Sequence, residues 1–242
     1  MYNIKNSKEL ASYINYTNLN NIISEAEMTE FLNNAKELNF NSVIIPPTYV
    51  TLAKEILAES NIKVGSVVGF PLGFEDTESK VAEAKCLVEK GVDEIEVVIN
   101  LSYLKDEKYS LIGKEIEQIR EAIGDKLLKV IIEVKALEDA EKSAIAQIAE
   151  KAGADYIKNS TGFVAPCHIY EIVNDLNILQ RYAPKVKIEI YGGIDSYKIA
   201  NQVLTAGADK ISSNHGAAIV NRYKELRENT QVKPKPITLS KK

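Results

Sequence analysis

Hydrophobic positions along the chain fall into two alternating kinds of segment. Short runs rich in β-branched residues predict strands at Tyr13–Thr17, Ser42–Pro46, Val64–Phe70, Glu94–Asn100, Leu128–Lys135, Asp155–Ser160, Val186–Tyr191 and Asp209–Ser213. Longer stretches with helical spacing of apolar residues predict helices between them, at Glu25–Leu38, Thr48–Glu59, Thr77–Lys90, Ser110–Ile123, Asp139–Lys151, Ile169–Gln180 and Tyr197–Thr205. Alternating elements of this size imply parallel βα units, and eight strands in 242 residues predict an α/β protein with a TIM (β/α)8 barrel. An open doubly wound sheet is the alternative, but no G-x-G-x-x-G motif follows the first strand.

A repeated pattern supports the barrel. The segments Gly91–Glu96, Gly153–Lys158 and Gly207–Ser212 share the form G-[AV]-D-x-I-x, and each follows a predicted helix and opens a predicted strand. The glycine ends the helix and the aspartate caps the turn, so the last residues of the three segments occupy equivalent strand positions. We expect one barrel domain over residues 1–224 and a loosely held polar tail, interrupted by prolines, over residues 225–242.

Composition narrows the class of protein. The chain is 45% hydrophobic and 26% charged with a formal net charge of −4, which is ordinary for a soluble protein and offers no basic stripe for nucleic acid. No apolar run reaches the roughly 18 residues of a membrane span, and the N-terminus carries no apolar signal core. We therefore expect a cytoplasmic protein without nucleic-acid or membrane partners. Its two histidines and two cysteines predict neither a metal site nor a disulfide framework.

Charged residues lie within the predicted strands. Strand side chains alternate between faces, and the apolar set of each strand should meet the helices. The other set then faces the barrel interior near the C-terminal mouth, where barrel active sites lie. It brings together five charges from four neighbouring strands: Glu96, Glu133, Lys135, Lys158 and Glu189. A structural ion-pair network is the alternative to a catalytic cluster, because buried charge is costly unless it is paired or used.

Lys158 is the candidate nucleophile. A lysine amine attacks a carbonyl only when it is neutral, and burial or a nearby cation such as Lys135 lowers its pKa. The resulting iminium withdraws electrons, so a carbon–carbon bond β to it can break or form. Glu96 and Glu133 could move the protons that this chemistry requires. The same carboxylates would raise the pKa of Lys158, and the sequence leaves open which effect prevails.

Loops that follow the strands supply candidate binding residues. In barrels such loops hold phosphate through backbone N–H groups, often with a helix N-terminus. We expect substrate contacts from the loops after the sixth, seventh and eighth strands: Ser160, Thr161, Gly162, Tyr191, Gly192, Gly193, Asn214 and His215. Tyr191 could equally be a packing residue, and His215 could equally lie on the loop surface.

At this point the motifs resemble a known family. VVGFPLG (Val67–Gly73), EIEVVINLSYLK (Glu94–Lys105), LKVIIE (Leu128–Glu133), ADYIKNSTGF (Ala154–Phe163) and YGGI (Tyr191–Ile194) are similar, in the same order, to deoxyribose-phosphate aldolase of the DeoC type. The resemblance runs from about Tyr13 to Val220. It implies a class I aldolase on a TIM barrel that interconverts 2-deoxyribose 5-phosphate with acetaldehyde and glyceraldehyde 3-phosphate, without metal or other cofactor. It also implies that Lys158 forms the Schiff base, and barrels of this kind often form dimers.

The departures from the family pattern fall at the expected active site. Glu96 stands where the family usually has Asp, Glu189 where it has a second lysine, and Asn15 where the first strand carries an Asp that would contact substrate. The loop Asn214–Gly216 replaces Ser-Ser-Gly, and Ile45–Pro47 replaces Val-Asn-Pro. We hypothesise that the auxiliary lysine has moved to Lys135 in the fifth strand, with Glu189 as its partner.

Three functions remain open from the sequence. The first is a deoxyribose-phosphate aldolase or a close variant, which is a carbon–carbon lyase. The second is a lysine-imine lyase, aldolase or cyclase acting on a different, unphosphorylated carbonyl substrate of a specialised pathway. The third is a barrel without catalytic activity, against which the retained Lys158 and its charged neighbours argue.

Overall fold

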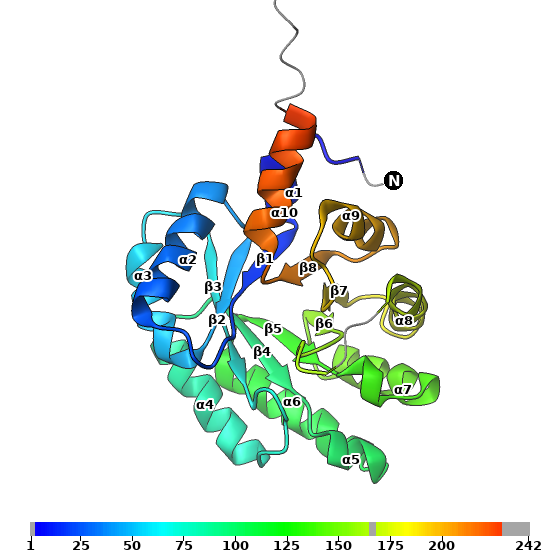
Figure 1. Cartoon of the computed structure of the whole chain (residues 1–242). Coiled ribbons are helices and arrows are strands. Elements are labelled where there is room, and N and C mark those ends of the chain that lie inside the picture. The colour runs from blue at the N-terminus through cyan, green and yellow to red at the C-terminus, as the bar shows by residue number, and fades with distance from the viewer. Residues whose placement is uncertain (1–2, 165–167, 229–242) are drawn as a thin grey trace, which may run out of the picture.

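Eight parallel strands close into a barrel in sequence order (Figure 1). The computed structural model describes residues 3–164 and 168–228. The strands are β1 (Ile14–Thr17), β2 (Ser42–Ile45), β3 (Lys63–Val68), β4 (Glu94–Val98), β5 (Leu127–Ile131), β6 (Tyr156–Lys158), β7 (Lys187–Tyr191) and β8 (Lys210–Ser213). β1 pairs with both β2 and β8, so the barrel has no free edge. The predicted TIM barrel is confirmed.

Helices surround the barrel and alternate with its strands (Figure 1). They are α1 (Ser7–Ser12), α2 (Glu25–Leu38), α3 (Val50–Ile56), α4 (Thr77–Glu89), α5 (Leu101–Lys105), α6 (Tyr109–Ile123), α7 (Asp139–Lys151), α8 (Ile169–Tyr182), α9 (Tyr197–Thr205) and α10 (Gly216–Tyr223). Shorter turns are η1 (Pro47–Tyr49), η2 (Val134–Ala136) and the π-helical η3 (Lys224–Glu228). No helix in the described residues is both long and apolar enough to cross a membrane.

The helix boundaries follow local sequence signals. Ser24 accepts a hydrogen bond from the Glu27 backbone while the Glu27 side chain accepts from the Ser24 backbone, which forms a capping box at the start of α2. The Asp76 side chain caps α4 by accepting a hydrogen bond from the Ser79 backbone N–H. Such caps satisfy N–H groups that a helix start leaves without partners, so the sequence alone located these starts.

Apolar side chains fill the layer between the strands and the helices. Fully buried residues such as Val130, Ile157 and Ile190 belong to one continuous hydrophobic core with the helix residues. The alternate strand positions carry polar and charged side chains that are equally buried, among them Glu96, Lys158 and Glu189. This is the alternation that the sequence predicted, and it places a charged cluster inside the barrel.

Two parts of the chain differ from the predicted elements. β5 ends at Ile131, four residues before the expected boundary, because Glu133 adopts a left-handed backbone conformation (φ 50°) and a 3-10 turn follows it. In the expected tail, Glu225–Glu228 continues α10 as part of the π-helical turn, and residues 229–242 lie outside the described residues.

Candidate active site

Lys158 lies at the end of β6 with its side chain 1% exposed. Its Nζ donates hydrogen bonds to Glu96 Oε2 (2.7 Å) and Ser212 Oγ (3.1 Å), and it lies 3.3 Å from Glu189 Oε1. The barrel register puts Lys158 directly beside Glu189. The structure therefore confirms that Lys158, Glu96 and Glu189 converge, although they are drawn from three different strands.

A second buried lysine, Lys129, lies deeper in the barrel on β5. Its Nζ is 2.8 Å from Glu189 Oε2, 2.8 Å from Glu94 Oε2 and 3.4 Å from Glu96 Oε1. The contact with Glu94 is ionic, since Glu94 Oε2 meets no donor at a hydrogen-bonding angle. Sequence reasoning missed Lys129, yet the alternation of Lys129, Ile131 and Glu133 on one face of the strand would have placed it inside.

Glu189 accepts hydrogen bonds from side chains on β8 and β1, in addition to its contacts with the two lysines. Ser212 Oγ donates to Glu189 Oε1, and Asn15 Nδ2 donates to Glu189 Oε2 at 2.5 Å. Asn15 is fixed in turn, because its Oδ1 accepts from Ser42 Oγ and from Asn41 Nδ2, both at 2.8 Å. Asn15 was expected to contact substrate. It does not line the cleft and instead orients Glu189 within the barrel.

Burial and neighbouring charges act in opposite directions on the pKa values of Lys158, Glu96 and Glu189. Burial opposes the charge on Lys158, but the carboxylates of Glu96 and Glu189 outweigh it and raise the pKa of Lys158. Burial likewise raises the pKa of Glu96 against the pull of both lysines. Burial also acts on Glu189, where Lys129 and Lys158 prevail and lower its pKa to about 2. Glu189 is thus a fixed anion, whereas Glu96 is the carboxyl group best able to accept a proton from Lys158.

Glu133 supports the loop after β6 and has no contact with the lysine amine. Its Oε1 accepts from Ser160 Oγ at 2.9 Å, and its Oε2 accepts from the Thr161 backbone N–H at 3.0 Å and from Thr161 Oγ1 at 2.5 Å. The left-handed backbone at Glu133 aims the carboxylate at this loop. Glu133 therefore acts on the loop that borders Lys158, and Thr161 is buried against it.

The expected inward position of Lys135 is wrong. Lys135 Nζ lies 2.6 Å from Glu171 Oε1 on α8, outside the barrel. The alternation of strand faces predicted an inward position, but it stops when β5 ends at Ile131. The hypothesis that Lys135 replaces the auxiliary lysine, with Glu189 as its partner, fails with it. Glu189 has a lysine partner on β5, and that partner is Lys129.

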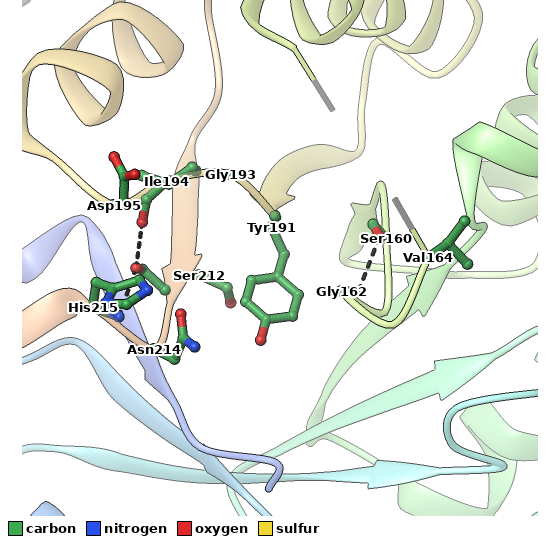
Figure 2. A pocket seen from close by; sticks show the side chains of 12 residues that line it. Ser160, Gly162, Val164, Tyr191, Gly193, Ile194, Asp195, Ser212, Asn214 and His215 are labelled. Atoms are coloured by element: carbon green, nitrogen blue, oxygen red, sulfur yellow. Dashed lines mark hydrogen bonds between the residues drawn. The ribbon is translucent and has the colours of Figure 1, made fainter. Parts of the chain in front are cut away.

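A cleft opens at the C-terminal mouth beside Lys158. Figure 2 shows Tyr191 projecting into it between Ser160 and Gly162 on one side and Ser212 and Asn214 on the other. Lys158 Nζ lies 4.8 Å from the centre of the Tyr191 ring, so the ring covers the amine. A Cβ on Gly162 would come within 2.3 Å of Tyr191 Cε1, and therefore only glycine allows the ring this position.

Most of the expected binding residues line this cleft. Its described lining consists of Ser160, Gly162, Val164, Tyr191, Gly192, Gly193, Ile194, Asp195, Ser212, Ser213, Asn214 and His215. Among the expected residues, Thr161 and Asn15 are absent from it. Sequence reasoning placed Ser212 and Ser213 at the end of the eighth strand without assigning them a contact, and it missed Asp195, whose position in the loop after β7 points to the mouth. Within the described residues no group of His, Cys, Asp or Glu side chains could hold a metal ion.

Comparison with known proteins identifies the fold family. Residues 6–225 match the family described as DeoC/LacD family aldolase. Deoxyribose-phosphate aldolase of Streptococcus suis (strain 98HAH33) is 40% identical over 214 residues, which is 88% of this chain and 96% of that protein. Deoxyribose-phosphate aldolase of Thermococcus kodakarensis is 37% identical over 220 residues, which is 89% of this chain and 97% of that protein.

Solved structures agree. The structure described as "QR15, an Aldolase" is 33% identical with a TM-score of 0.86, and the match covers 92% of this chain and 98% of that one. The deoxyribose phosphate aldolase from Aeropyrum pernix, described as tetrameric, is 26% identical with a TM-score of 0.82 over 92% of this chain and 94% of that one. With its buried lysine and barrel, the chain belongs to the DeoC/LacD aldolases and is a class I aldolase, a carbon–carbon lyase.

Proposed function

We propose that the protein catalyses reversible aldol cleavage of 2-deoxy-D-ribose 5-phosphate, or of a related 2-deoxy sugar, through an imine on Lys158. The observation that carries the proposal is the buried amine of Lys158, held 2.7 Å from a carboxyl group of Glu96 and hydrogen-bonded to Ser212, which lines the cleft. The names of the relatives support an aldolase that cleaves a 2-deoxy sugar. Cleavage between the second and third carbons of such a sugar gives acetaldehyde and a three-carbon aldehyde.

The first steps form the imine. Lys158 gives a proton to Glu96, and the neutral Nζ adds to the aldehyde carbon of the open-chain sugar. The carbinolamine loses water when Glu96 returns the proton to the departing hydroxyl, which leaves an iminium. The positive charge of that iminium lies where the charge of Lys158 lay, so the carboxylate of Glu189 stabilises both.

The carbon–carbon bond then breaks. The third-carbon hydroxyl loses its proton, its C–O becomes a carbonyl, and the electron pair of the bond between the second and third carbons moves into the iminium to give an enamine. A proton added to the second carbon regenerates an iminium of acetaldehyde, and water releases it from Lys158. We assign these proton transfers to Glu96 acting through water, with Lys129 as a fixed cation beside Glu96 and Glu189 as a fixed anion beside Lys158.

The substrate contacts belong to the loops of the cleft. We assign binding roles to the side chains of Ser160, Tyr191, Asn214 and His215 and to the backbone of Gly162, Gly192 and Gly193, since all of them line it. We further propose that the enzyme works in the cytoplasm and that it forms a homodimer. Light scattering would test the oligomeric state, and the tetramer recorded for the Aeropyrum pernix relative supports self-association in the family.

Acetaldehyde release tests the proposal. Purified protein is given 2-deoxy-D-ribose or its 5-phosphate, and acetaldehyde is measured by its coupled enzymatic reduction. Wild type should release acetaldehyde, and Lys158→Met should release none above buffer because no other amine reaches the aldehyde. Lys114→Met is the matched control, since Lys114 is exposed on α6, and it should behave as wild type. Equal release by wild type and Lys158→Met would refute the role of Lys158.

A further inference from the structure

The cleft continues beyond Tyr191 into a second lobe. The first lobe has a volume of about 260 Å³ and lies over Ser212, whose hydroxyl accepts a hydrogen bond from Lys158. The second lobe is lined by Asn18, Leu19, Asn20, Gly162, Phe163, Tyr191 and Asn214. The two share Gly162, Tyr191 and Asn214, and so they meet at the Tyr191 ring that covers Lys158. The chemistry of these walls decides which far end of a substrate the enzyme accepts.

The charged groups on these walls are unsuited to a phosphate. Neither lobe has a lysine or arginine among its described lining residues. The first lobe is instead bordered by Asp195, an exposed acidic residue in the loop after β7. Lys198 is the next basic residue along the chain; it is exposed on α9 and does not line the cleft. Below the cleft, the carboxylates of Glu94, Glu96 and Glu189 outnumber the ammonium groups of Lys129 and Lys158 by three to two.

The uncharged donors on the walls suit a different ligand. Gly192 and Gly193 both have positive φ (98° and 72°) and line the first lobe, where their backbone N–H groups are candidate donors to a ligand. Ser212, Ser213 and Asn214 add hydroxyl and amide groups. Such neutral donors and acceptors bind sugar hydroxyls as well as phosphate oxygens, and so they do not select for phosphate. The selection falls to the nearby full charge, which is negative.

We propose that the preferred substrate is an uncharged, hydroxyl-bearing aldehyde or 2-deoxy sugar, and that Asp195 disfavours its phosphorylated counterpart. This inference rests on the proposed aldol chemistry at Lys158 and names the substrate class. A phosphate dianion placed beside a carboxylate at the edge of solvent is disfavoured by about tenfold in affinity, and salt weakens the effect. Asp195 can also accept hydrogen bonds from substrate hydroxyls, which a phosphate at neutral pH does not offer.

The test compares two substrates that differ only in the phosphate. Values of kcat/KM for cleavage of 2-deoxy-D-ribose and 2-deoxy-D-ribose 5-phosphate are measured for wild type, Asp195→Asn and the control Asp125→Asn. Asp125 is exposed in the loop between α6 and β5, at the opposite end of the barrel, so its replacement makes the same change in net charge. Both substitutions are conservative and lie in exposed loops.

Wild type should cleave the unphosphorylated sugar at least as efficiently as the phosphate ester. Asp195→Asn should shift the ratio toward the ester by about tenfold at low salt and by less at high salt, while Asp125→Asn leaves it unchanged. A wild-type preference for the ester, or an Asp195→Asn ratio equal to that of wild type, overturns the inference. Failure of the proposed aldol chemistry would show separately, because acetaldehyde has no distal group and would then form no adduct with Lys158.

Discussion

At the scale of single residues, Lys158 combines complete burial with two acidic neighbours. The nucleophile must be neutral, yet Glu96 and Glu189 favour its protonated form and raise its pKa. Lys129 acts in the opposite sense on Lys158, as a buried cation beyond the two carboxylates. The proportion of neutral amine therefore depends on the balance between Glu189 and Lys129, and removing either one shifts it in a known direction.

The acid limb of the kcat/KM profile should report this balance. A raised pKa for Lys158 means that kcat/KM increases as pH rises and the amine loses its proton. Glu189→Gln removes a negative neighbour, which lowers the pKa of Lys158 and moves the limb to lower pH by about 1 unit. Lys129→Gln removes a positive neighbour and should move it to higher pH. Lys114→Gln serves as the control without a shift, and a shift of both buried variants in the same direction would contradict this account.

Tyr191 and Asp195 show which features of single residues the sequence does not reveal. Tyr191 directly precedes the Gly192–Gly193 turn that the sequence identified and Asp195 follows it by two residues, but only Tyr191 was expected at the site. The covering of Lys158 by the Tyr191 ring depends on Gly162, which lies on a different loop. A contact between distant segments leaves no pattern in the neighbouring sequence. A lysine within a strand, such as Lys158, is recognised from the strand-forming residues on either side of it.

At the scale of elements, prediction succeeded where local signals were strong. The bounds of α2, α7 and α9 match the sequence-based ranges, and two of these helices begin with a capping box. α1 and α5, with 6 and 5 residues, and α10 with 8, were not predicted, since so few residues carry little periodicity. Short helices of this kind are stabilised by the packing around them more than by their own sequence.

The end of β5 is the clearest failure at this scale. The run from Leu128 to Lys135 is apolar and alternating, so a single strand was expected. Glu133 has a left-handed backbone, which is costly for a residue other than glycine, and its carboxylate contacts Ser160 and Thr161, which follow β6. Because the strand was expected to continue past Glu133, Lys135 was predicted to be the inward lysine of the fifth strand, and Lys129 was not identified.

α4 and α6 are joined by a salt bridge outside the active site. Lys80 Nζ lies 3.0 Å from Glu115 Oε1 and donates to the Val98 carbonyl at 2.8 Å, with both side chains fully buried. Lys80→Met should lower the free energy of unfolding by about 3–5 kcal/mol in urea titrations, because Glu115 is left buried without its partner. Lys80→Met combined with Glu115→Leu should recover most of the loss. A double variant no more stable than Lys80→Met would show that the ion pair itself, and not the orphaned charge, sets the cost.

At the scale of the whole molecule, the barrel gathers charges that are far apart in sequence. Glu96 and Lys158 are 62 residues apart in the sequence. Closure of the eight strands nevertheless brings Lys158 into contact with both Glu96 and Glu189. Sequence patterns predicted the fold and the burial of Lys158 beside Glu96 and Glu189 inside the barrel. They could not predict which charges pair, because pairing depends on strand register and on where each strand ends.

The central claim is that Lys158 alone forms the imine, and reductive trapping tests it most directly. The protein is incubated with acetaldehyde and sodium borohydride, digested, and the modified lysine is located by mass spectrometry. We expect one ethyl group on Lys158 in wild type and the same adduct in Lys135→Met, since Lys135 pairs with Glu171 outside the barrel. No adduct, an adduct on another buried lysine such as Lys129, or loss of the Lys158 adduct in Lys135→Met would contradict the account.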